Sequence, residues 1–169
     1  MTKPPTTTGF EAILAAVRTT RERDMLMQAI DACIKNLYHT KPAPLEELLA
    51  EIIPYTIAKP LITTMRKQLK DQTTAAIEEF FNKLTEALQA LKVLELELAF
   101  EAQEPSVALL SRWIREHIGP DVIVEFTEDP LLLGGARIAF QGKFKEINLA
   151  DVIESVLIRE SARIQKILA

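Results

Sequence analysis

The sequence predicts an α+β protein, in which an all-helical bundle precedes a small mixed α/β part. Two observations predict this class. Up to residue 91 the apolar residues recur at helical spacing, and no glycine occurs between Phe10 and Ile118. From Val93 onward, short segments in which apolar and polar residues alternate indicate strands. We therefore expect a helical domain over residues 1–92 and an α/β domain over residues 93–169.

Four segments of the first half carry the apolar stripe that is typical of a helix. They cover residues 10–19, 21–38, 45–53 and 74–91. Pro42 and Pro44 separate the second segment from the third, because two closely spaced prolines cannot continue a helix. Pro54 and Pro60 predict that the stretch to Leu69 is either kinked or split into two short helices. The first half is therefore expected to be a bundle of four or five helices.

The second half predicts the order strand, helix, strand, strand, strand, helix. The alternating runs cover residues 94–100, 122–126, 136–140 and 143–147. A helix over residues 105–118 follows the first run, and Gln141-Gly142 is typical of a hairpin turn between the last two. Asn148 can cap a final amphipathic helix that extends to Leu168.

Composition excludes several classes of protein. With 48% hydrophobic and 26% charged residues among 169, the chain has the balance of a globular protein. The net charge of -4 argues against binding to nucleic acid. The chain contains no apolar run of the length that a transmembrane helix needs, and its first eight residues lack the core of a signal peptide, so we expect a soluble cytosolic chain. The single cysteine, Cys33, excludes an internal disulfide and is expected to be a small buried apolar residue.

One motif in the second half is specific. Asp129-Pro130 is followed by Leu131 to Leu133, then by Gly134-Gly135, a strand and the turn at Gly142. This order resembles the C-terminal signature of the delta subunit of F-type rotary ATP synthases, whose mitochondrial relative is the oligomycin-sensitivity-conferring protein. The resemblance covers residues 93–168, and the helical character of the first half is also that of the family.

The resemblance implies a non-catalytic stator subunit. The helical domain would bind the N-terminal helices of alpha subunits on the catalytic head, and the C-terminal domain would hold the C-terminal helices of the b subunits. The protein would lie on the cytoplasmic face of the cell membrane without inserting into it. No catalytic residue, cofactor, metal ion or nucleic-acid partner is expected.

Binding a long helix requires an apolar groove, and several residues are candidates for it. In the bundle they are Phe10, Ile13, Leu14, Val17, Phe80 and Leu84, and the alternative is that these residues are purely structural core. Trp113 is most simply a core residue that packs on the sheet, and the alternative is an anchor for a partner. The apolar residues at the end of the final helix either pack on a partner helix or lie exposed at the terminus. They are Ile164, Ile167 and Leu168.

The Asp-Pro and Gly-Gly pairs need no chemistry to explain them. Pro130 biases Asp129 toward an extended conformation, and paired glycines suit a bulge or a crossover between strands. A phosphate-binding loop would instead need a helix directly after Gly135, where the sequence is strand-like.

Three alternatives to a delta-type subunit stay open. A small-molecule enzyme would use Asp129 beside a deep pocket at the glycine pair. A peripheral-stalk subunit of an archaeal or vacuolar-type ATPase would need a long uninterrupted N-terminal helix, which the prolines oppose. The third alternative is a helical adaptor unrelated to energy conversion.

Overall fold

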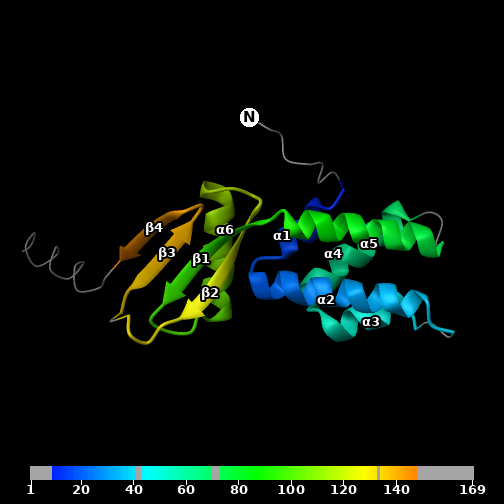
Figure 1. Cartoon of the computed structure of the whole chain (residues 1–169), viewed down its shortest axis with the longest axis horizontal. Coiled ribbons are helices and arrows are strands. Elements are labelled where there is room, and N and C mark those ends of the chain that lie inside the picture. Colours follow the sequence, from blue (N-terminus) through cyan, green and yellow to red (C-terminus); the bar gives the residue numbers. More distant parts are fainter. Residues whose placement is uncertain (1–8, 41–42, 70–72, 133, 148–169) are drawn as a thin grey trace, which may run out of the picture.

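The helices precede the sheet, as the sequence predicts (Figure 1). The computed structural model describes residues 9–40, 43–69, 73–132 and 134–147. Within these ranges, five helices form a bundle, and a four-stranded mixed sheet follows with one further helix packed against it. The protein therefore has the predicted α+β class. The expected final helix over residues 148–168 lies outside the described residues.

The bundle helices agree with the predicted segments in order and approximate length. They are α1 (Glu11–Ala16), α2 (Thr20–Leu37), α3 (Leu45–Ile52), α4 (Tyr55–Gln68) and α5 (Thr74–Gln89). A capping box begins α2, in which the Thr19 hydroxyl accepts from the Glu22 amide and the Glu22 carboxylate accepts from the Thr19 amide. The first helix is shorter than predicted, because Val17 is already extended and the connector to α2 runs beside the sheet.

The two prolines of the middle stretch have different effects. Pro54 separates α3 from α4, whereas α4 continues through Pro60. Proline at position 60 removes the amide that would bond to the carbonyl of Thr56. Thr56 is exposed, so water can hydrate its carbonyl group, and the split at Pro60 that the sequence allowed does not occur.

The sheet has the strand order β2-β1-β3-β4. Its elements are β1 (Lys92–Leu98), α6 (Glu104–His117), β2 (Val122–Glu128), β3 (Ala136–Phe140) and β4 (Lys143–Ile147). Strand β1 pairs in parallel with β2 and antiparallel with β3, and β3 pairs antiparallel with β4. Gln141 and Gly142 have φ angles of 49° and 76°, the positive values that a two-residue hairpin turn of type I′ requires.

The alternation along β1 and β2 separates two faces of the sheet. Leu94, Leu96 and Val124 pack with Ile114 of α6 in one apolar core. Glu95 and its neighbour in register on β2 lie on the opposite face. The predicted sorting of apolar and charged side chains is therefore confirmed over residues 94–98, whereas Phe100 lies beyond the end of β1 and is exposed.

The bundle and the sheet share packed residues. The first residue of β1, Lys92, lies at the predicted boundary between the two parts. The bundle core nevertheless includes Ile123 of β2, which is fully buried, and Val93 of β1 packs against it. The backbone of Thr19 also forms a parallel bridge with Val124. The sheet therefore supplies part of the wall that closes the bundle.

Cys33 is fully buried in the bundle core, as predicted, and this gives a testable pH dependence. Burial raises the pKa of its thiol from 9.0 to about 11. Because the folded state holds this proton more tightly, the stabilisation is complete below pH 9 and is lost as pH rises toward 11. The free energy of unfolding should fall by about 1.4 kcal/mol per pH unit in that window from this group alone.

Urea unfolding of the parent and of Cys33→Ala, each followed at about pH 8 and about pH 10.5, measures this contribution. The variant lacks the thiol titration, so its stability should decline less than that of the parent. Equal declines in the two proteins would contradict the assignment.

Candidate partner-binding surfaces

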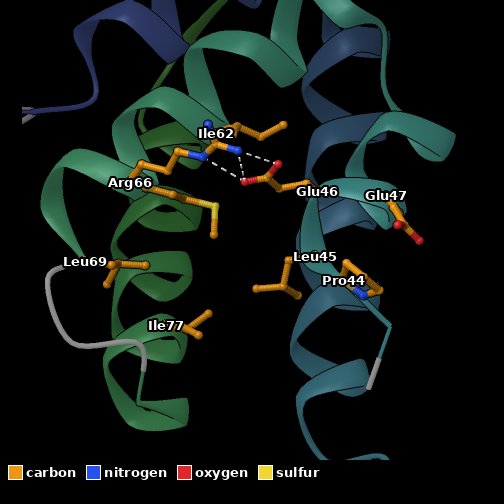
Figure 2. Close-up of a pocket in the computed structure, with 9 residues that line it drawn as sticks. Pro44, Leu45, Glu46, Glu47, Ile62, Arg66, Leu69 and Ile77 are labelled. Carbon is orange, nitrogen blue, oxygen red and sulfur yellow. Dashed lines mark hydrogen bonds and ion pairs between the residues drawn. The ribbon is translucent and has the colours of Figure 1, made fainter. Parts of the chain in front are cut away.

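An apolar groove lies at the end of the bundle that is remote from the sheet (Figure 1, Figure 2). Helix α2 leads away from the sheet and α5 returns to it, so the groove, at the start of α3 and α5 and the end of α4, occupies the far end. Its volume is about 360 Å³. We call it the bundle-end groove, and its lining residues are Pro44, Leu45, Glu46, Glu47, Ile62, Met65, Arg66, Leu69 and Ile77.

The floor of the bundle-end groove follows from the periodicity of α4. Ile62, Met65 and Leu69 recur on one face of this helix, and all three are half-buried. Leu45 faces them from the first turn of α3 (Figure 2). These apolar side chains remain partly exposed because α3 and α4 do not close over them at this end. The groove can therefore accept further apolar side chains.

One ion pair connects the two helices beside the groove. Arg66 donates from Nε and Nη2 to the carboxylate of Glu46, over 2.6 to 2.8 Å (Figure 2). Both side chains are exposed, so the pair contributes at most about 1 kcal/mol to stability. It supplies a polar rim to an apolar floor, which is the usual anatomy of a protein-binding surface.

A second exposed apolar surface lies on α6, in the sheet part of the molecule. Leu109 is 68% exposed and Trp113 is 50% exposed. The indole of Trp113 stacks on the imidazole of His117, with 4.6 Å between ring centroids and 14° between planes. We call Leu109 and Trp113 the α6 flank. Large exposed aromatic groups of this kind are enriched at protein interfaces.

The position of Trp113 corrects the interpretation that it belongs to the core. The buried face of α6 consists of Val107, Ser111 and Ile114, because this helix packs on the sheet with one side and approaches α1 through Arg115. The side of α6 that packs on the sheet and on α1 therefore does not include Trp113. The alternative interpretation, a partner anchor, stays a prediction.

The bundle residues expected to form a groove are core residues, which is a second correction. Phe10, Ile13, Leu14, Val17, Phe80 and Leu84 are each at most 8% exposed. Phe10 and Phe80 meet edge to face, with 5.3 Å between ring centroids. These six side chains therefore offer no open surface to a partner helix. Ile164, Ile167 and Leu168 lie outside the described residues.

The signature forms a turn that Asp129 organises. Its Oδ1 accepts from the amide of Leu131 at 3.0 Å, and its Oδ2 accepts from Arg137 at 3.2 Å. Its amide donates to the carbonyl of Leu98, which ties the end of β2 to β1. Gly134 follows with φ of 72°, a value that L side chains rarely adopt, and Gly135 leads into β3. Both carboxylate oxygens of Asp129 are thus engaged in holding the crossover between strands.

The sequence did not point to the bundle-end groove. The spacing of Ile62, Met65 and Leu69 was a usable signal, but the uncertain effect of Pro60 obscured it. Nothing in the sequence indicated that Arg115 contacts α1, since an arginine in the last turn of a helix is usually solvated.

Among the described side chains, no three or more His, Cys, Asp or Glu gather in a way that could hold a metal ion. In the same part of the chain, none of the helices has both the length and the apolar character needed to cross a membrane.

No protein-family model matches the chain, and a search of curated proteins also found no match. A function can therefore be proposed only from the geometry of the surfaces and from the resemblance of the signature.

Proposed function

We propose that this chain is a non-catalytic stator subunit of an F-type ATP synthase. In this role it joins the catalytic head to the peripheral stalk and prevents the head from turning with the rotor. The observation that carries the proposal is the presence of two separate exposed apolar surfaces, the bundle-end groove in the helical part and the α6 flank in the sheet part. The resemblance of the Asp129–Gly142 segment to the delta-type signature supports it.

The two surfaces suit two different helical partners. An amphipathic helix can insert apolar side chains between Leu45 and Met65 in the bundle-end groove, while its polar side meets the Glu46–Arg66 pair. In the stator the occupant of this groove is the N-terminal helix of an alpha subunit. The C-terminal helix of a b subunit packs on the α6 flank, with Trp113 as its anchor. The helices of the bundle span 6 to 18 residues, so the described part of the chain offers no support for the alternative with one long N-terminal helix.

Binding of synthetic peptides to the full chain tests the proposal. One peptide, the alpha peptide, is the N-terminal helix of the alpha subunit, and the other, the b peptide, is the C-terminal helix of the b subunit. Both come from the same organism as the chain, and calorimetry measures each affinity. Leu45→Asp should weaken the alpha peptide at least about tenfold, because a carboxylate in an apolar contact costs more than about 1.4 kcal/mol. Trp113→Ala should weaken the b peptide about 30-fold, the effect of a hot spot of about 2 kcal/mol.

Each variant has a matched control. Leu45 and Tyr55 are both the first residue of a helix that follows a proline, and an acidic residue in a first turn favours the helix. Tyr55 is 75% exposed and lies outside the groove, so Tyr55→Asp should bind normally. Phe144→Ala, on the sheet face opposite α6, is the control for Trp113. Failure of both peptides to bind the parent chain overturns the proposal, and a loss confined to the controls contradicts the assigned surfaces.

A further inference from the structure

Arg115 connects the sheet part to the bundle across about a hundred residues of sequence. It lies in the last turn of α6, and its guanidinium group reaches the carbonyl oxygens at the end of α1. Nη2 donates to Leu14 at 3.0 Å and also to Val17, and Nη1 donates to Ala15. One side chain thus bonds to three carbonyl groups of one short segment.

The environment of Arg115 is unusual for a cation. Within the described residues it forms no ion pair, and its Nε is buried without a hydrogen-bond partner. Desolvation by burial lowers the pKa of Arg115, although an arginine stays protonated at neutral pH. The carbonyl groups that it contacts are those that a helix leaves unbonded at its C-terminal end. A lysine, which carries a compact point charge, cannot span the same carbonyls with a planar fork.

The connector between α1 and α2 is held from two further directions. The amide of Val124 in β2 donates to the carbonyl of Arg18 at 3.0 Å, which extends the sheet edge by one bridge at Thr19. Arg18 donates from Nη1 to Glu104 in the first turn of α6 at 2.6 Å, and it also bonds to Glu22. Residues 14–19 are therefore held by β2 along the backbone and by both ends of α6.

We infer that Arg115 is a lock that makes the bundle and the sheet move as one rigid body. The other described cross-contacts include a backbone bridge at Thr19, an exposed ion pair to Glu104, and the packing of Ile123 and Val93 on the bundle core. Arg115 is the contact that fixes the orientation of α6 relative to α1, because its two terminal nitrogens bond to three different carbonyl groups at once. The use of this lock to resist torque rests on the proposed stator function, whereas the lock itself does not.

The distance between the two parts is the direct readout. Spin labels at Gln28→Cys on α2 and Lys143→Cys on β4 occupy exposed sites of the full chain, while native Cys33 is buried and should not react. Pulsed electron paramagnetic resonance then gives the distribution of distances between the labels. The parent chain should give one narrow peak. Arg115→Met retains the apolar stem but has no donors, so its distribution should lose the single narrow peak.

Two other variants keep the test decisive. Arg112→Met changes an exposed arginine on the same helix and should preserve the narrow peak. Arg115→Lys keeps the charge without the fork, so it should also broaden the distribution, and it carries the test if Arg115→Met does not fold. A distribution as narrow as that of the parent in either folded Arg115 variant overturns the lock. Peptide affinities measured in parallel separate the two proposals, since loss of peptide binding bears on the stator function and leaves the distance result unchanged.

Discussion

Phe81→Ala is expected to lower the free energy of unfolding by about 3–5 kcal/mol. Phe81 is the largest fully buried side chain in the described part of the protein, and it meets Phe80 edge to face with 5.7 Å between ring centroids. Truncation removes a whole ring from the centre of the bundle and leaves a cavity that α5 cannot collapse. A domain of ordinary stability has about 5–15 kcal/mol in total, so the variant retains little margin.

Urea unfolding followed by far-ultraviolet circular dichroism measures this loss. Phe100→Ala provides the control, because Phe100 is 63% exposed and its truncation should change the free energy by no more than about 0.5 kcal/mol. A loss below about 1.5 kcal/mol for Phe81→Ala would contradict the described bundle core, since it would be far below the range for a buried aromatic ring.

Ile123→Ala should destabilise both parts of the protein together, by about 2–5 kcal/mol. Ile123 belongs to β2, yet its fully buried side chain lies in the core of the bundle. Its truncation therefore opens a cavity at the junction and removes apolar contact from both parts. We expect one cooperative unfolding transition in the parent and in the variant, shifted to lower urea concentration in the latter.

Two probes test this coupling. Fluorescence of Trp113, the single tryptophan, reports on α6, and circular dichroism reports mainly on the bundle helices. Coincident transitions are the standard evidence for a single cooperative unit. Ile147→Ala is the control, since Ile147 is 40% exposed on the last described strand. Separate transitions for the two probes in the parent chain would contradict the shared core.

The element pattern was predictable because it depends on local chemistry. The stripe along α5 and the alternation along β1 record which side chains must be buried together, and each repeats with the period of its backbone. Turn residues act in the same local way, so Gln141-Gly142 predicted the hairpin without knowledge of the rest of the chain. Pro60 is the exception, since its effect depends on whether the affected carbonyl can reach water.

The surfaces were not predictable, because an apolar stripe does not say what will cover it. Phe10 and Phe80 each belong to an apolar stripe with helical spacing, and in the bundle the two rings are buried against each other. Ile62 and Met65 also belong to a stripe, but they line the groove where α3 and α5 begin and stay half-buried. The prediction that Trp113 is a core residue was wrong for a related reason. Helix α6 packs on both the sheet and α1, and the face that it buries between them does not include Trp113.

The α+β class, the order of the described helices and strands, and the turn built by Asp129 and its glycines follow from the sequence alone, because periodicity and backbone sterics act within a few residues. Which apolar residues became core and which became surface depended on the assembled fold. The tertiary structure also places Arg115 beside the carbonyl groups of α1 and packs Ile123 of β2 into the bundle core. These outcomes depend on residues that are distant along the chain, and burial is a property of the contacts between them.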